Sequence, residues 1–495
     1  METYRHGSYG QLGDDIVTEV SEISAGVVYL GTAPINLVKG CDRSKVVNRP
    51  VTIRNFKEAK EIFGYSSNWE QYTLCEAIKA HFGNTSDNIG PIHLINVLDP
   101  SIHIDEEQKT GTITFASKKA YIKNNLMIVD SFELDGKAEG TDYTIEFDYD
   151  KEQLIISDIS ANGIESNTYK YSQIEMPFAT MKEAVIGTET EAGQTTGINA
   201  LKIVYQECGD IPRKVLAPSF SCCKDVNDKI KSVARSINGR FIAQDYADIP
   251  LVDDANNSID TIAKAEAWAI ANGYDSEFSK NFWPMAVKGD EKYHISTLFA
   301  VRQMLVDAEN DGIPYETASN KTIGIDGLYF GASAINSGLD LEDANELNSK
   351  GITTAVYYGG NWRLWGGHTA AYKFENETEQ GKEIFDTSVA MQIHLANDFI
   401  LRNAELIDKP MAVGLMQSIV NEEQEILDNL VSIGALTGEP KFIADNMSSN
   451  NIKSGSYRWI LNDTPTSQFK DGTIIVVFTD KGYSALLGGA ENEEE

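Results

Sequence analysis

Hydrophobic positions change their spacing along the chain, and each change predicts a different kind of structure. A near-continuous apolar run at 26–31 is typical of a strand that is buried on both faces. Helices are predicted at 56–63 and 69–82, where apolar residues recur at helical spacing, and a second buried strand is predicted at 92–98. This part of the chain is therefore expected to form an α/β unit.

Between residues 101 and 175 the helical spacing disappears. Turn dipeptides such as Asp135-Gly136, Glu139-Gly140 and Asn162-Gly163 separate short runs that alternate or are rich in β-forming residues. These runs lie at 112–115, 121–129, 143–147 and 154–157. The spacing predicts a small antiparallel β-sandwich inserted into the α/β unit.

Strands and helices alternate again from about residue 178 to residue 373. Strands are predicted at 214–217, 240–244, 282–287 and 353–358. Helices are predicted at 226–237, 259–271, 294–309 and 341–348. Such alternation favours a mostly parallel sheet with helices on its faces.

The last part of the chain is predicted to be mainly helical. One long amphipathic helix is expected over 375–406, and a second from Val413 to about Ile433, closed by Gly434. Strand-like runs follow at 457–461 and 473–479, and the chain ends in an acidic tail.

The N-terminal segment, residues 1–24, is polar and rich in glycine, and only one short run in it alternates like a strand. That run consists of Ile16, Val17, Thr18, Glu19 and Val20. A lone strand at a chain end is marginal unless another strand pairs with it. The segment is therefore either frayed or an arm lent to a neighbouring chain, with a hinge expected near 21–25.

Composition limits the possible functions. A length of 495 residues predicts about two to four domains. No apolar run is long enough to span a membrane, no Sec-type signal is visible, and the cysteines are too few for a disulfide framework, which favours a reducing compartment.

The net charge of −32 argues against partners that are nucleic acids or anionic membranes. Its simplest interpretation is solubility. A sharper interpretation is that copies of the chain would repel one another unless basic patches on one copy meet acidic patches on the next.

No motif for catalysis or for binding a metal or cofactor is complete, so we predict no catalytic residues, metal or cofactor. His93 lies in a predicted buried strand and is expected to be a core residue. The loop beginning at Asp307 resembles a calcium loop, but Ala318 stands where the last acidic ligand is required, so a helix end closed by Gly312 is favoured. His368 stands beside a threonine, as in subtilisin-type proteases, but the serine and aspartate motifs are missing.

Several short motifs, in this order, resemble those of the tail sheath proteins of contractile bacteriophage tails and related injection machines. They are Tyr4, His6, Gly7 and Tyr9; Gly31-Thr32-Ala33-Pro34; Phe56 to Gly64; Trp283-Pro284; Asn320 to Gly327; Leu347 to Ile352; and Trp365 to Thr369. His368 replaces an arginine that is usual in the family.

The resemblance implies an α+β multidomain fold. It has a degenerate subtilisin-like α/β domain without protease activity, an inserted antiparallel β-sandwich, an α-rich C-terminal domain and an extended N-terminal arm. The corresponding divisions are 1–24 for the arm, 25–100 with 177–374 for the α/β domain, 101–176 for the sandwich, 375–480 for the C-terminal sheath domain and 481–495 for the acidic tail.

The resemblance also implies a function. Such a subunit forms a helical homopolymer around an inner tube by strand exchange, and contraction drives the tube through a cell envelope. Its expected partners are copies of itself, the tail tube protein, and baseplate and tail terminator proteins. Its expected location is the virion tail, assembled in the bacterial cytoplasm. The arm residues are Ile16 to Val20 and, near the other end, Ile474, Ile475, Val476, Val477 and Phe478.

Two alternatives remain open from the sequence. One is a subtilisin-like or other α/β hydrolase, which would need a complete set of nucleophile and base. The other is a carbohydrate-binding surface protein, suggested by the β-rich segment 101–175 and by aromatic clusters such as Trp362 with Trp365.

Overall fold

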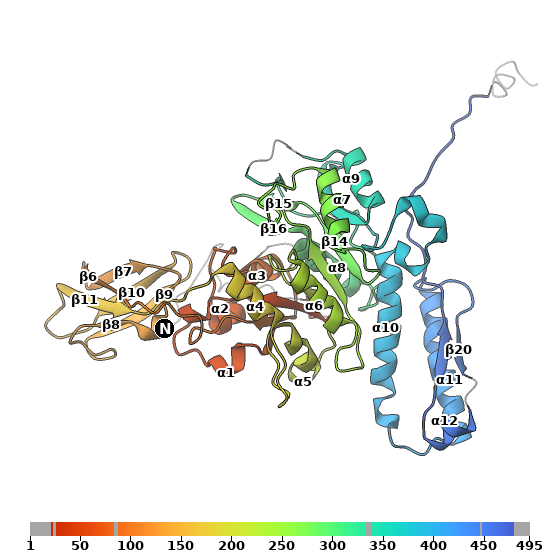
Figure 1. Cartoon of the computed structure of the whole chain (residues 1–495), viewed down its shortest axis with the longest axis horizontal. Coiled ribbons are helices and arrows are strands. Elements are labelled where there is room, and N and C mark those ends of the chain that lie inside the picture. The colour runs from red at the N-terminus through yellow and green to blue at the C-terminus, as the bar shows by residue number, and fades with distance from the viewer. Residues whose placement is uncertain (1–20, 23–25, 84–87, 333–337, 446–447, 480–495) are drawn as a thin grey trace, which may run out of the picture.

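The computed structural model describes residues 21–22, 26–83, 88–332, 338–445 and 448–479. These residues form an elongated molecule (Figure 1). Small β-sheets lie at one end, a sheet flanked by helices occupies the middle, and a pair of long helices lies at the other end. Among the described residues, no helix is long and apolar enough to cross a membrane.

The middle of the molecule is built on one sheet. Its strands are β2 (Val27–Gly31), β3 (Pro50–Ile53), β5 (Ile92–Asn96), β12 (Lys214–Leu216), β13 (Gln244–Asp248), β14 (Ser279–Phe282), β18 (Ile352–Tyr358) and β19 (Asn361–Trp365). They form an 8-stranded sheet in the order β19-β18-β14-β13-β12-β2-β5-β3. Neighbouring strands from β5 to β18 pair parallel, and the edge strands β3 and β19 pair antiparallel. The sheet is therefore mixed and rich in parallel pairs.

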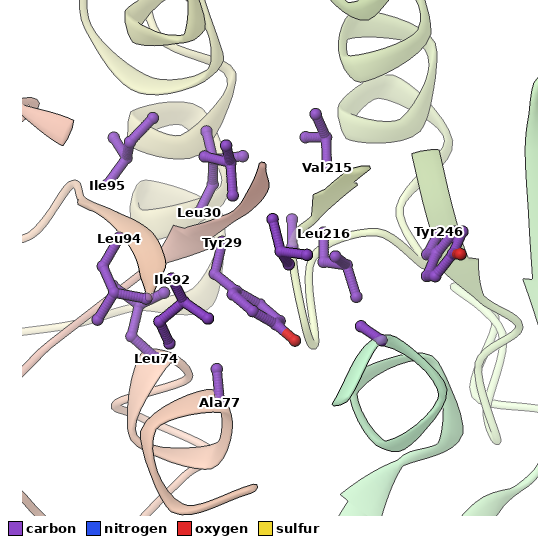
Figure 2. Close-up of a cluster of buried hydrophobic side chains, with 14 of the residues drawn as sticks. Tyr29, Leu30, Leu74, Ala77, Ile92, Leu94, Ile95, Val215, Leu216 and Tyr246 are labelled. Carbon is purple, nitrogen blue, oxygen red and sulfur yellow. The ribbon is translucent and has the colours of Figure 1, made fainter. Parts of the chain in front are cut away.

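Helices cover both faces of this sheet. They include α1 (Arg43–Val46), α2 (Phe56–Phe63), α3 (Leu74–Phe82), α4 (Phe178–Ile186), α5 (Val204–Cys208), α6 (Lys224–Ala234), α7 (Ile262–Ala271), α8 (Ile295–Glu309) and α9 (Leu341–Ser349). Figure 2 shows why β2 is apolar along its length: Leu30 points to one face of the sheet, and Tyr29 points to the other, where Ala77 of α3 lies. Both faces are buried, so every residue of β2 is buried, as the run at 26–31 predicts.

The strand predicted at 240–244 was placed wrongly. Strand β13 occupies Gln244–Asp248, and the apolar residues Phe241 and Ala243 lie in the loop before it. The strand escapes a hydrophobicity pattern because its buried side chains are largely polar and bond to groups elsewhere in the fold. For example, Asp248 accepts hydrogen bonds from the Ser296 and Ser221 hydroxyls.

The single strand predicted at 282–287 is in fact two. Strand β14 ends at Phe282, and β15 (Met285–Lys288) belongs to a separate 3-stranded sheet with β16 (Glu291–His294) and β17 (Gly327–Tyr329). Pro284 lies between them, and a proline cannot donate the N–H that a continuous strand requires.

Two predicted helices are shorter than their apolar patterns. The helix predicted at 69–82 begins at Leu74, because Trp69 and Tyr72 are buried from a turn that precedes it. The helix predicted at 375–406 is a regular α-helix only in α10 (Asp386–Arg402). The residues before it form 3₁₀ turns, where His368 and Thr369 side chains bond the carbonyl groups of residues 384 and 383.

The β-rich segment forms two 3-stranded antiparallel sheets, β7-β10-β9 and β6-β11-β8. The strands are β6 (Lys109–Thr114), β7 (Lys119–Lys123), β8 (Glu133–Leu134), β9 (Tyr143–Asp148), β10 (Gln153–Asp158) and β11 (Ser166–Tyr171). Their inward side chains share one apolar cluster, which includes the fully buried Leu154 and Ile156. This cluster is distinct from the core around the central sheet.

The C-terminal part pairs α10 with α11 (Val413–Ser432) and adds β20 (Lys441–Ala444), α12 (Ser449–Lys453) and β21 (Trp459–Asn462). Its apolar cluster includes Met391, Leu427 and Phe442. The strand predicted at 457–461 is present as β21, displaced by about one or two residues, as is usual for element ends.

Candidate interaction surfaces

The last described residues form an extended segment that is exposed to solvent. Residues 473–479 have no regular secondary structure, although the sequence predicts a strand there. Its aliphatic side chains, Ile474 to Val477, are 85%, 82%, 84% and 74% exposed. Figure 1 shows this segment running away from the body.

The chain is anchored to the body immediately before this segment. The Gln468 side chain donates to the carbonyl of Tyr315 at 2.8 Å and contacts the Thr387 hydroxyl at 3.2 Å. Lys470 forms an ion pair with Glu377. The exposed segment therefore begins at a defined position on the body.

Such a segment is poorly suited to remain in water. Burying one Val or Ile side chain is worth roughly 1.5–3 kcal/mol, and β-branched residues favour a strand. An exposed aliphatic run such as Ile474 to Val477 also invites pairing with other chains. The sequence of residues 473–479 therefore indicates a strand that another surface must complete.

The small sheet formed by β20 and β21 offers such a surface. The two strands pair antiparallel, and the Asp445 N–H donates to the Arg458 carbonyl at 2.9 Å. The alternate residues Trp459 and Leu461 consequently direct their N–H and C=O groups to the outer edge of β21. Within the described part of the chain, no backbone group bonds to this edge. A two-stranded sheet is marginal alone, so a third strand would stabilise it.

The predicted arm residues at the other end, Ile16 to Val20, lie outside the described residues. The residues that follow them, β1 (Ser21–Glu22), pair parallel with β4 (Ile89–Gly90). His81 supports β4 because its Nδ1 is 3.1 Å from the Ile89 carbonyl oxygen, while its Nε2 is 2.8 Å from the Tyr29 hydroxyl. Burial lowers the pKa of His81 to about 4, so the ring is neutral near pH 7.

Comparisons with known proteins agree with this architecture. Over 442 residues, the chain is 25% identical to the tail sheath protein of Burkholderia phage BcepMu, covering 84% of each chain. None of the protein-family models compared with the chain matches it. In sequence over most of its length, and in fold, the chain is similar to contractile tail sheath proteins.

Solved sheath structures share the fold at low sequence identity. The helical sheath of the anti-feeding prophage (AFP) in its contracted state gives a TM-score of 0.52 at 14% identity, over 97% of this chain and 99% of that one. The sheath complex of the extracellular contractile injection system PVC, also contracted, gives 0.51 at 10% identity, over 98% and 99%. A chain of the AFP baseplate gives 0.55 at 13% identity, over 96% and 99%.

The acidic residues and the histidine at the carboxyl ends of the parallel strands bond to one another, although ligands often bind at such ends. Asp248 accepts hydrogen bonds from the Ser296 and Ser221 hydroxyls at 2.6 and 3.3 Å. His294 pairs through Nδ1 with Glu76 at 2.7 Å. Among these described residues, Asp248 binds both serine hydroxyls, and His294 is paired with Glu76.

The charge state of His294 also argues against a role as a general base. Burial alone would lower the pKa of His294, but the carboxylates of Glu76 and Asp248 outweigh it and raise the pKa to about 9. A protonated imidazole cannot accept a proton from serine, so it serves as a buried cation that joins α3, α8 and β13.

The other residues considered for chemistry are also structural. His368 is buried, stacks on Tyr372 with ring centres 3.7 Å apart, and has its pKa lowered to about 4 by burial. Asp307 forms a buried ion pair with Lys214 at 2.6 Å, and the N–H of Gly312 closes the helix on the Asp307 carbonyl. The described residues hold no cluster of His, Cys, Asp and Glu suited to a metal ion.

His93 is a satisfied core histidine, as expected. Its Nε2 lies 2.9 Å from Asp210, and its Nδ1 lies 3.1 Å from the Thr52 hydroxyl. Burial would lower the pKa of His93, but hydrogen bonds with Asp210 and Cys208 raise it to about 9.

The apolar pattern of Ile474 to Val477 predicts a strand, and the structure leaves this run exposed without regular secondary structure. The outer edge of β21 was predicted only as a strand, since nothing in a linear pattern shows which edge of a sheet stays unpaired. The predicted strand at 457–461 lies in a mainly helical part of the chain, far in sequence from the strands of the central sheet. This isolation is the signal that could have indicated an edge without a neighbouring strand.

Proposed function

We propose that this chain is the structural subunit of a contractile tail sheath and that it polymerises by strand exchange, in which residues 473–479 of one copy add to the outer edge of β21 in a neighbouring copy. The observation that carries this proposal is the exposure of four consecutive aliphatic residues, Ile474 to Val477. An added strand would bury those side chains and pair the backbone groups of Trp459 and Leu461.

The way the segment is attached suits a mobile linkage between copies. Lys470 holds the chain to the body, and Gly472 separates this anchor from the strand. Glycine permits a wide range of backbone angles. The main-chain hydrogen bonds of the added strand could therefore persist while the bodies of the two copies rotate relative to each other, as contraction requires.

Ile16 to Val20 are proposed as a second exchanged strand. Their alternating pattern suits a strand with one buried face. The pairing of β1 with β4 supports this role, because it would fix the start of the arm on its own body.

The finer division of the fold is also a proposal. The separate apolar clusters around the central sheet, in the β-rich segment and in the C-terminal part support an α/β domain at 25–100 and 177–374, a sandwich at 101–176 and a C-terminal sheath domain at 375–480. The parallel-rich sheet supports a degenerate subtilisin-like α/β domain. The arm at 1–24 and the tail at 481–495 complete this division.

The assembled polymer would surround an inner tube and, when released by a baseplate, contract to drive the tube through a cell envelope. A tail terminator would cap it, and it would be assembled in the bacterial cytoplasm and located in the virion tail. Helix α11 is the proposed tube contact. Its exposed face carries Glu422, Glu425 and Asp428, and no Lys or Arg occurs between Lys409 and Lys441. A basic tube surface would match this face.

The decisive experiment compares Val476→Pro with Val476→Thr in the full-length protein. Proline removes the backbone N–H and prevents pairing on that side, whereas threonine keeps both the N–H and the β-branched shape. We expect Val476→Pro to remain a folded monomer by sedimentation and circular dichroism, and Val476→Thr to form helical tubes in negative stain.

Tubes of normal length and yield from Val476→Pro would rule out strand addition by this segment. Deleting Met1 to Ile23 tests the second strand in the same assay, and we expect soluble monomers that do not polymerise. Normal sheaths from that deletion would remove the N-terminal arm from the mechanism.

A further inference from the structure

Two adjacent cysteines lie in the loop between strand β12 and helix α6. All five cysteines of the chain are free, and Cys222 and Cys223 are both partly exposed. Cys223 stands at the N-terminal cap of α6, but its side chain makes no capping hydrogen bond. The thiol of Cys223 is therefore not needed to begin the helix.

The loop that carries the two cysteines is fixed by hydrogen bonds. The N–H of Ser221 donates to the carbonyl of Ala217 at 2.7 Å, and the carbonyl of Ser221 accepts from the Tyr274 hydroxyl at 2.7 Å. Ser219 has a φ of 66°, in the left-handed region that is uncommon for residues other than glycine. Such a conformation persists only where neighbouring contacts hold it. The two thiols consequently have defined positions.

The two thiols contact each other. The Cys222 sulfur lies 3.2 Å from the Ser219 carbonyl oxygen, and the side chains of Cys222 and Cys223 hydrogen bond to each other. The hydrogen bond from Cys222, helped by the Lys182 ammonium, lowers the pKa of Cys223 against burial and two nearby carboxylates. The same hydrogen bond, together with burial, raises the pKa of Cys222. Cys222 therefore keeps its proton, and Cys223 ionises first.

The other cysteines have different surroundings. Burial raises the pKa of Cys41 to about 11 and that of Cys75 to about 12, so both are protonated near pH 7. Cys208 is partly exposed and hydrogen bonds with His93. The thiolate is the reactive form of cysteine. Cys223 combines easier ionisation with a second thiol in contact with it.

We propose that Cys222 and Cys223 form a redox-sensitive dithiol, whose co-reactant is a peroxide and whose product is a disulfide between the two residues. Thiols that respond to oxidants are accessible, ionise readily and often stand beside a second, resolving thiol. The loop between β12 and α6 supplies each of these features. The inference does not depend on strand exchange, because it rests on side chains within one copy.

The reaction with hydrogen peroxide has two steps. The Cys223 thiolate attacks one peroxide oxygen, the O–O bond breaks and hydroxide leaves, which gives a sulfenic acid on Cys223. The Cys222 sulfur then attacks the Cys223 sulfur, the S–O bond breaks, and water leaves with the Cys222 proton. The two sulfurs together lose two electrons, and the peroxide is reduced to water and hydroxide.

The product should be easy to reduce again. The Cα atoms of adjacent residues lie about 3.8 Å apart, closer than the roughly 4.4–6.8 Å that is usual in disulfides. A disulfide between neighbours is therefore strained, and strained disulfides are readily reduced. In a reducing compartment the pair remains as two thiols, and it oxidises only where peroxide is present.

The test treats the full-length protein with hydrogen peroxide at pH 7, blocks the remaining thiols and weighs the peptides. We expect the peptide with both cysteines to lose two hydrogen atoms before the peptides with Cys41, Cys75 or Cys208 change, and dithiothreitol to restore it. Without peroxide, iodoacetamide should alkylate Cys223 at least about tenfold faster than Cys41 or Cys75. The pH profile of that alkylation should have a midpoint below that of free cysteine, about 8.5.

Matched variants separate the two roles. Cys222→Ser keeps a hydroxyl that can bond to the Ser219 carbonyl but removes the resolving sulfur, so we expect a sulfenic acid on Cys223 that dimedone traps. Cys223→Ser should leave Cys222 as a thiol under the same treatment. Because the Cys223 side chain makes no cap, the unfolding temperature of Cys223→Ser should be no lower than that of the unchanged protein.

Three results would overturn the inference. One is reaction of Cys41, Cys75 or Cys208 before Cys223. Another is oxidation of Cys223 to a sulfinic acid without a disulfide to Cys222. The third is a disulfide that joins Cys223 to a second copy, seen as a dimer on a non-reducing gel. All three are read from the unchanged protein, so they decide the question even if a variant fails to fold.

Discussion

Strand β2 and the segment 473–479 have nearly the same composition and opposite environments. Both are short runs of aliphatic residues, VVYLG in one and TIIVVFT in the other. Every side chain of β2 is buried between two layers of helices, whereas Ile474 to Val477 are 74–85% exposed. A β-forming sequence therefore predicts that a strand needs neighbours on its faces and edges. It does not show whether those neighbours belong to the same copy of the chain or to another one.

The largest expected effect breaks a buried charge pair that joins β14, a strand of the same sheet as β2, to the start of α10. Lys280 and Asp386 form an ion pair at 2.8 Å, with side chains 1% and 7% exposed. Asp386→Ala would leave a buried lysine without its partner, and we expect the free energy of unfolding to fall by about 3–5 kcal/mol in urea titrations. The control is Asp386→Leu with Lys280→Met, which should recover most of the loss.

The second prediction compares equivalent truncations in the two runs. Leu30→Ala removes a fully buried side chain and should lower the free energy of unfolding by about 2–5 kcal/mol. Val476→Ala removes an exposed one and should change it by less than about 0.5 kcal/mol. Equal effects in calorimetry of the monomer would show that residues 473–479 are buried in their own copy.

The third prediction uses pH to separate the same two regions. His81 is buried and neutral, and its pKa falls from 6.5 to about 4 on folding. Below pH 6.5 the unfolded chain binds the proton more readily, so the free energy of unfolding falls as the pH drops toward 4, by about 3 kcal/mol from His81 alone. His368 and His394, whose pKa values are also lowered to about 4 by burial, act in the same direction.

The control for this prediction is His81→Gln, which can still hydrogen bond but does not titrate. Its loss of stability between pH 6.5 and pH 4 should be smaller than that of the unchanged protein. Residues 473–479 contain no titratable group. Pairing by this segment should therefore be insensitive to pH wherever the body remains folded, and an equal pH dependence in both regions would contradict the assignment.

The smallest expected effect concerns exposed charge pairs. Lys57 and Glu61 lie 3.8 Å apart on α2, with side chains 85% and 65% exposed. Lys57→Ala should change the free energy of unfolding by less than about 0.5 kcal/mol. A larger loss in thermal denaturation would show that surface charges contribute to the stability of the body.

Much of the architecture could be predicted because periodicity depends on local burial. The runs at 26–31, 92–98 and 143–147 all correspond to strands, and the helices at 56–63 and 294–309 are close to the observed ones. Strand β13 was misplaced, because its buried Gln244, Asp245 and Asp248 look like loop residues until their partners are known.

The surfaces proposed for strand exchange were also only partly predictable from the sequence. Ile474 to Phe478 could be identified, since an apolar β-branched run needs covering wherever it lies. The outer edge of β21 could not, because a linear pattern does not show which edge of a strand pair stays without a neighbour.

The sequence by itself determined which segments of this chain must be covered, because hydrophobic spacing and β-branching act over a few neighbouring residues. It also determined that the chain carries no complete catalytic motif and a large negative charge. Only the tertiary structure decided what covers each segment. It buried β2 inside the body and left residues 473–479 outside. It also joined charged residues that are far apart in the sequence, such as Lys280 with Asp386, because folding alone sets which distant residues become neighbours.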